Sequence, residues 1–154
     1  MATLYGTNAD YNLVDNPRTM IPAGEAGGRI RLLYDTYTSL SALTSGDILK
    51  MGAPIPKGAR VVEGILKTSD HGNTATCKWG YAASADGVEV ADDDAFMVNV
   101  DLNAAADVFL ASQNQANPAA IGKKFSAEVQ PQIEMTATAT ATGTIQTFIL
   151  FVLD

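Results

Sequence analysis

The sequence predicts an all-β protein, and three observations support this. Thirteen glycines and six prolines are spread over 154 residues, and both residue types favour short strands and turns over long helices. Apolar and polar residues alternate with a period of two in several segments, most regularly over Ile133–Thr142, as they do in strands with one buried face. Apolar residues make up 47% of the chain, which is enough for the core of one domain.

The segment Gly46–Thr68 is the frame around which we expect the other strands to pack. It is interpreted as a strand, a Gly/Pro corner and a second strand. Pro54 and Pro56 hold the residues before them extended, and Gly58 closes a tight turn. The second strand, Ala59–Thr68, is apolar on both faces. Gly64 in its middle indicates either a bulge or a strand that is covered on both faces.

Residues 1–28 precede the first strand and are expected to form an extended N-terminal arm, followed by a β domain over residues 29–154. The arm has no sustained period, yet it holds too many apolar residues for a solvated tail. We therefore expect it to lie on its own domain or on a partner. In Arg29–Tyr37 the residues Ile30, Leu32, Tyr34 and Thr36 share one side, which predicts a half-buried strand.

In Thr74–Tyr81 the alternation predicts that four side chains point inward: Ala75, Cys77, Trp79 and Tyr81. Asp70-His71-Gly72-Asn73 precedes this strand and has the composition of a hairpin turn. The acidic run Asp92–Asp94 is suited to capping a short helical turn through Phe96–Val98. The alanine-rich segment Asp101–Leu110 is ambiguous.

The end of the chain predicts a hairpin. Ile133–Thr142 alternates, Thr142-Gly143 turns the chain, and Thr144–Leu153 returns as a strand whose end is apolar on both faces. A strand of this kind is expected to be central in a sheet or covered by a neighbour, because an exposed one promotes aggregation. The alanine side of the first strand leaves room for an opposite sheet or for another subunit.

Charge and cysteine content narrow the possible partners. The net charge is −7 and the pI about 4.5, which disfavours binding to nucleic acid or to an anionic membrane. The longest apolar run, Phe148–Leu153, is far shorter than the roughly 20 residues of a membrane-spanning helix.

The single cysteine rules out an intramolecular disulfide. We expect a protein made in a reducing compartment and without a signal peptide.

The sequence predicts no catalytic, cofactor or metal site. His71 is the only histidine, and its Gly/Asn setting favours a solvated turn residue over a catalytic one. Cys77 alternates into the face of Trp79, which favours a buried thiol. The run Asp92–Asp94, with Asp86 and Glu89, leaves calcium binding open beside a solvated acidic loop. The aromatic residues Trp79, Tyr81 and Tyr34 are interpreted as core, with a sugar-binding platform as the alternative.

One resemblance bears on function. The phrase Gly-Asp-Ile-Leu-Lys-Met-Gly…Ile-Pro-Lys-Gly-Ala-Arg-Val-Val-Glu-Gly-Ile-Leu within Gly46–Thr68 resembles the head decoration, or cement, proteins of tailed bacteriophages. The resemblance continues through the turn at Asp70, the alternating strand, the acidic run and the closing strands, and so covers about residues 46–154. Leu102–Gln115 does not align with it.

The resemblance implies a jelly-roll-like antiparallel β-sandwich over residues 29–154. It also implies a non-enzymatic virion protein, usually a homotrimer, that sits on the outer surface of an icosahedral capsid and bridges major capsid proteins. The chain would be made in the host cytoplasm. The expected capsid contacts lie in the arm, at Tyr5, Tyr11, Leu13, Arg18, Met20 and Ile21. The expected oligomer interface is formed by Phe148, Leu150 and Val152. The alternative is a β-sandwich module of a virion that binds carbohydrate or a host surface, for which Trp79 or Tyr81 is expected to be exposed.

Overall fold

The computed structural model describes residues 29–110 and 121–153, and these residues fold into eight strands. The arm expected over residues 1–28 lies outside the described part of the chain. The strands are β1 (Arg31–Thr38), β2 (Ile48–Lys50), β3 (Ala59–Thr68), β4 (Thr76–Tyr81), β5 (Asp92–Asp101), β6 (Ala106–Phe109), β7 (Pro131–Ala137) and β8 (Thr144–Leu153).

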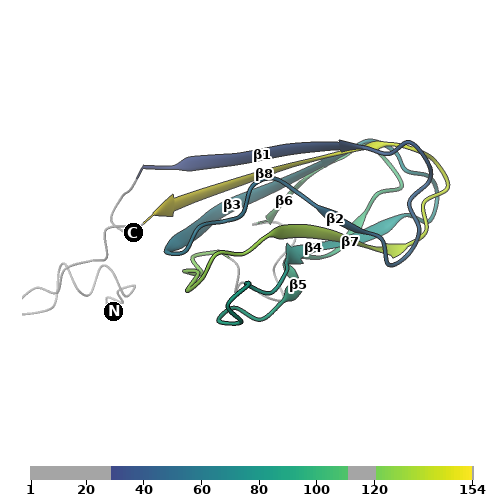
Figure 1. Cartoon of the computed structure of the whole chain (residues 1–154). Coiled ribbons are helices and arrows are strands. Elements are labelled where there is room, and N and C mark those ends of the chain that lie inside the picture. The colour runs from purple at the N-terminus through teal and green to yellow at the C-terminus, as the bar shows by residue number, and fades with distance from the viewer. Residues whose placement is uncertain (1–28, 111–120, 154) are drawn as a thin grey trace, which may run out of the picture.

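Two four-stranded antiparallel sheets lie face to face (Figure 1), with the strand orders β1-β8-β3-β6 and β2-β7-β4-β5. We call them the first and the second sheet. The chain changes sheet after every strand except β4, which is followed by β5 in the same sheet. This order is that of a jelly roll, in which two Greek keys form a double-sheet sandwich. The predicted all-β, jelly-roll-like sandwich is therefore confirmed.

The two predicted hairpins are wrong. β7 pairs with β2 and β4, whereas β8 pairs with β1 and β3, so Thr142-Gly143 lies in a crossing between the sheets. The turn at Asp70 likewise connects β3 of the first sheet to β4 of the second. Alternation reports which side of a strand is buried, and Ile133 and Met135 do face the core. It does not report which strand lies alongside, because a jelly roll places sequence neighbours in opposite sheets.

The strand–corner–strand frame is confirmed, and the corner carries the chain from the second sheet to the first. The Ala59 amide donates to the Pro56 carbonyl at 3.1 Å, and Gly58 between them has a φ of 84°. This left-handed conformation is one that glycine adopts at no steric cost. Ile55 is fully buried and its amide donates to the Val129 carbonyl at 2.8 Å.

The core between the sheets contains a cluster of aromatic side chains. Trp79 packs edge-on to Phe96 with ring centroids 5.3 Å apart, and Tyr81 packs edge-on to Phe125 at 5.1 Å. The predicted inward residues of this strand region are confirmed, since Ala75, Cys77, Trp79 and Tyr81 are all buried. A Cβ atom on Gly64 would lie 3.2 Å from the Trp79 ring, so the glycine provides the room for the indole. The register shift in β3 falls between Val61 and Glu63.

His71 is buried at the end of the sandwich where β1, β3, β5 and β7 end, which overturns its prediction as a solvated turn residue. Its amide donates to the Leu102 carbonyl at 2.9 Å, and its carbonyl accepts from the Thr140 and Ala141 amides, both at 3.0 Å. Three connections between strands therefore meet at this one residue. Each comes from a distant part of the chain, so no local pattern indicates the burial.

The acidic run Asp92–Asp94 begins β5 and does not cap a helical turn, so this expectation is also wrong. Lys78 on the neighbouring strand β4 lies 2.6 Å from the Asp93 carboxylate. The ambiguous segment after Asp101 contains the short strand β6, which pairs with the end of β3.

Candidate interaction surface

The outer faces of the two sheets differ in chemistry. The outer face of the second sheet is mainly ionic and polar, although Ile48 of its edge strand β2 is 54% exposed there. The Lys78 ammonium lies 2.6 Å from Asp93 and 3.2 Å from Glu134. The hydrogen bond between Lys78 and Asp93 raises the pKa of the lysine and lowers that of the aspartate. The Thr76 and Thr136 hydroxyls lie 2.8 Å apart on the same face. Such a face is stable in water.

The outer face of the first sheet carries four large apolar side chains in one line. Tyr34 of β1 pairs in register with Phe148 of β8. Phe148 pairs in turn with Ile65 of β3, and Ile65 pairs with Phe109 of β6. We call these four residues the apolar row. The Tyr34 and Phe148 rings lie 4.8 Å apart, and Tyr34 and Phe109 are 50% and 46% exposed. An apolar line across a whole sheet is typical of an interaction site.

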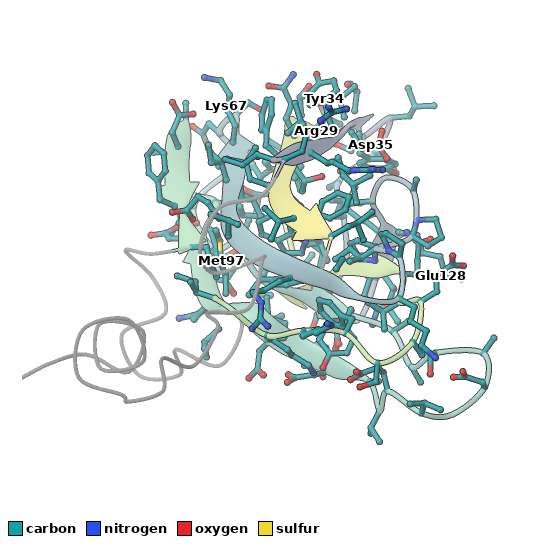
Figure 2. All side chains as sticks on the ribbon, turned by 90° about the vertical axis from the view of Figure 1, so that its left-hand side faces the viewer. Arg29, Tyr34, Asp35, Lys67, Met97 and Glu128 are labelled. Atoms are coloured by element: carbon teal, nitrogen blue, oxygen red, sulfur yellow. The ribbon has the colours of Figure 1, made fainter. Side chains whose placement is uncertain are left out.

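A polar row runs beside the apolar row, again with one residue from each strand: Thr36, Gln146, Lys67 and Asp107. The Gln146 amide donates to the Tyr34 hydroxyl at 3.2 Å, and the Lys67 ammonium lies 3.1 Å from Asp107. Figure 2 shows Tyr34 and Lys67 pointing outward from this sheet. A hollow of about 230 Å³ lies where the two rows meet, lined by Ile65, Lys67, Asp107, Phe109 and Phe148.

The side of β1 that was expected to be buried is the one that forms this surface, so that expectation is wrong. Ile30 and Leu32 are 58% and 55% exposed. The opposite side of β1 holds Leu33, which packs against the core, and Asp35. The Asp35 carboxylate accepts a hydrogen bond from the Gly52 amide at 2.7 Å. A polar residue therefore faces inward because the corner after β2 supplies its donor, and this contact is not visible in the sequence.

The residues predicted at an oligomer interface occupy two environments. Phe148 and Leu150 are partly exposed on the outer face of the first sheet, next to Tyr34 and Leu32. Val152 is buried and lies outside the core cluster, opposite Arg60 of β3. The predicted capsid-contact residues of the arm, Tyr5, Tyr11, Leu13, Arg18, Met20 and Ile21, lie outside the described residues.

Four of the side chains considered for chemistry are buried in the fold. Cys77 is buried, and burial raises the pKa of its thiol to about 12. Burial also lowers the pKa of His71. Trp79 and Tyr81 are buried, which overturns the exposed platform expected for a carbohydrate-binding module. Over residues 29–110 and 121–153 no group of three or more His, Cys, Asp or Glu is placed to hold a metal ion.

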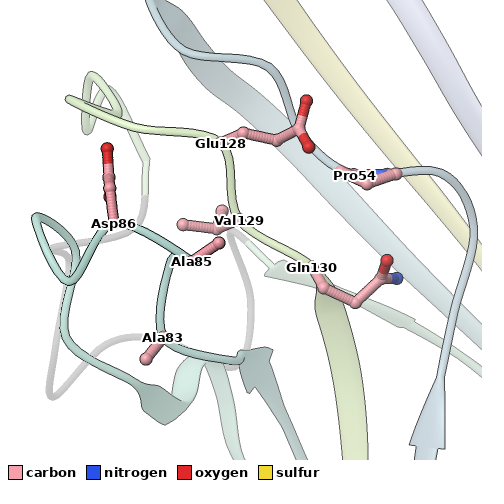
Figure 3. A pocket seen from close by; sticks show the side chains of 7 residues that line it. All are labelled: Pro54, Ala83, Ala85, Asp86, Glu128, Val129 and Gln130. Carbon is pink, nitrogen blue, oxygen red and sulfur yellow. The ribbon is translucent and has the colours of Figure 1, made fainter.

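A pocket of about 340 Å³ opens at the end of the sandwich opposite His71 (Figure 3), lined by Pro54, Ala83, Ala85, Asp86, Glu128, Val129 and Gln130. Asp86 and Glu128 come from different segments. The Asp86 carboxylate accepts hydrogen bonds from the Ser84 hydroxyl at 2.7 Å and from the Val88 amide at 3.1 Å. The bond from Ser84 is the main reason why its pKa is lowered. Asp86 therefore stabilises its own loop.

Among the described residues, no helix has the length and apolar character to cross a bilayer.

Comparison with known proteins shows a likeness of structure. No family model and no curated protein matches the sequence. A chain of the solved capsid of Ralstonia phage GP4 superposes with a TM-score of 0.67 and 20% identity, over 88% of this chain and 92% of that one. A chain of the cyanophage Pam1 capsid asymmetric unit superposes with a TM-score of 0.56 and 15% identity, over 89% and 94%. The likeness is one of fold.

Proposed function

We propose that this chain is a non-enzymatic structural protein of a phage virion, which decorates an icosahedral capsid and cements it by bridging major capsid proteins. The observation that carries the proposal is the match over 88% and 89% of this chain to chains from two phage capsid structures. The match also covers 92% and 94% of those chains. Those two chains and this one therefore have about the same length and a similar fold.

The surface chemistry supports a role in assembly. An apolar row on one outer face and an ionic opposite face suit a protein that binds on one side and meets water on the other. Cementing requires no catalysis. It requires many modest contacts that are repeated by symmetry, because multivalent attachment multiplies weak affinities. The resemblance implies a homotrimer on the outer capsid surface, and the arm is proposed to contact the shell.

Binding to shells tests this function. Shells assembled from the major capsid protein of the same phage are mixed with the chain and sedimented. The full chain is expected to co-sediment in a fixed ratio and to raise the temperature at which the shells disassemble. Deletion of residues 2–27 is expected to abolish co-sedimentation while the circular dichroism of the β domain is retained.

A matched pair of arm variants tests whether shell binding depends on the apolar side chains of the arm or only on its length. Serine at the apolar arm positions Tyr11, Leu13, Met20 and Ile21 is expected to weaken binding. Serine at the polar positions Asn8, Asn12 and Asn16 is expected to leave it intact. Unchanged binding after the deletion removes the arm from the mechanism, and absence of binding by the full chain contradicts the proposed function.

A further inference from the structure

The outer face of the first sheet carries one exposed or partly exposed apolar residue of the apolar row on each of its four strands, and its acidic and basic residues nearly balance. By their register, β3 and β6 place two basic and two acidic residues on it: Arg60, Lys67, Glu63 and Asp107. Lys124, the bridge partner of Arg60, adds a third basic residue at the edge of this face. β1 and β8 contribute only uncharged residues to the same side. The chain as a whole carries a net charge of −7, so two copies repel each other in general. On this face three basic and two acidic residues leave a net charge of only about +1, so close approach of two copies meets little net repulsion.

The two rows are self-complementary. When two such faces are placed together about a two-fold axis parallel to the strands, β1 lies over β6 of the second copy and β8 lies over β3. Tyr34 then meets Phe109, and Phe148 meets Ile65, so that aromatic side chains meet aromatic or aliphatic ones. In the polar row, Thr36 meets Asp107 and Gln146 meets Lys67. No charged group of either row faces a like charge, which a self-pairing surface requires.

The remaining contacts are compatible with this arrangement. Leu150 comes opposite Glu63 of the second copy, and the Glu63 carboxylate is turned back to accept a hydrogen bond from its own Gly64 amide at 2.9 Å. Leu32, 55% exposed beside Leu150, widens the apolar area. A face of four strands and about eight residues per strand covers about 500 Å². Pairing therefore buries about 1,000 Å² in total, near the lower limit for a specific interface.

We infer that the apolar and polar rows of the first sheet form the docking site for the same face of a second copy of this chain, with the second sheet left facing water. This inference deepens the proposed function and rests on it for its biological use, but it is measured without shells. It assigns to Phe148 and Leu150 a two-fold contact in place of the three-fold contact expected from the sequence. The three-fold contacts of a trimer would then use other surfaces.

Analytical ultracentrifugation of the purified full chain tests the inference. Phe109→Glu places a charge in the apolar row, and Leu32→Glu places one beside it. Both are expected to weaken the pairing by about tenfold or more, since each buries an unpaired carboxylate. The mass of the assembly is then halved, from a dimer to a monomer or from a pair of trimers to a trimer. The matched control is Ile48→Glu on the second sheet, where Ile48 is 54% exposed. This variant is expected to leave the mass of the assembly unchanged.

Cross-linking tests the orientation. In the variant Tyr34→Cys/Phe109→Cys the two thiols lie about 14 Å apart within one chain but face each other across the proposed interface. A bis-maleimide that spans less than about 10 Å is expected to link two chains, and Tyr34→Cys alone is expected not to. Cys77 does not interfere, because it is buried.

Three results overturn the inference: a monomer at all concentrations, a mass that Phe109→Glu leaves unchanged, or a fall to one third, which marks a three-fold contact. A chain that stays monomeric but loses shell binding through Phe109→Glu assigns the face to the shell, and this also overturns the inference. The proposed function survives each of these results, because only the shell-binding assay decides it.

Discussion

Gly143→Ala is expected to destabilise the fold because the added methyl group would clash with neighbouring side chains. Gly143 lies in the crossing from β7 to β8, where its amide donates to the Ser39 hydroxyl at 2.8 Å and its carbonyl accepts from the Ser39 amide at 2.9 Å. An added Cβ would lie 2.6 Å from the His71 Nε2 and 2.6 Å from the Ser69 Oγ. His71 is fully buried and therefore has no open space into which its ring can move.

The magnitude follows from these contacts. Adding a methyl group to a well-packed interior costs about 1–3 kcal/mol. A shift of the crossing also strains the two hydrogen bonds with Ser39, each of which contributes about 1 kcal/mol. We therefore expect a loss of about 2–4 kcal/mol in the free energy of unfolding. This is a large part of the roughly 5–15 kcal/mol of a typical domain.

Urea unfolding followed by the fluorescence of the single tryptophan, Trp79, measures this loss. Gly58→Ala is the control: Gly58 has a φ of 84° and open space around its Cβ position, so only backbone strain of about 1–2 kcal/mol applies. In the double variant His71→Ala/Gly143→Ala the clash with the imidazole is gone and only the close contact with the Ser69 Oγ remains, so the two effects are expected to be non-additive by about 1 kcal/mol or more. A loss no greater than that of Gly58→Ala, together with additive effects, would refute the reasoning.

Three further predictions concern buried groups. Because burial lowers the pKa of His71 below its ordinary value of 6.5, the unfolded chain takes up a proton first as the pH falls. Stability is thus unaffected above about pH 6.5 and decreases below it, by at most about 1.4 kcal/mol per pH unit; urea unfolding between pH 7.5 and 5 should show this slope in the wild type and not in His71→Gln. Cys77, with a pKa of about 12, is expected to react with a disulfide reagent only after unfolding, and rapid native labelling would contradict its burial. Trp79 is fully buried, so its emission is expected to be blue-shifted and unchanged by sugars, and a sugar-dependent shift would favour the carbohydrate-binding alternative.

The sequence predicts those parts of the fold that depend on the character of a single strand. The alternation in Thr74–Tyr81 correctly predicts that Trp79 and Tyr81 lie in the core. One side of this strand holds only apolar residues and the other side is polar, so the buried side is clear from the sequence. The side of β1 was misassigned, since Leu33 and Leu32 are equally apolar and the decisive contact of Asp35 with Gly52 is remote in sequence. The two hairpin predictions are wrong because the Greek-key crossings of a jelly roll place consecutive strands in opposite sheets.

The candidate surface was predictable only in part. The two apolar faces of β8 indicated that Phe148 and Leu150 would need a cover, and both lie on the outer face of the first sheet. Tyr34, Ile65 and Phe109 come from three other segments, and only the strand registers align them with Phe148. The burial of His71 depends on three connections that meet at the end of the sandwich, and no local signal reports it.

The central claim is that this jelly roll binds the outside of a phage capsid. Cryo-electron microscopy of shells with and without the added full chain tests it most directly. The account predicts additional density on the outer surface, at regular lattice positions, into which the eight-stranded sandwich fits. Shells that look identical with and without the chain, or density confined to the interior, would contradict it.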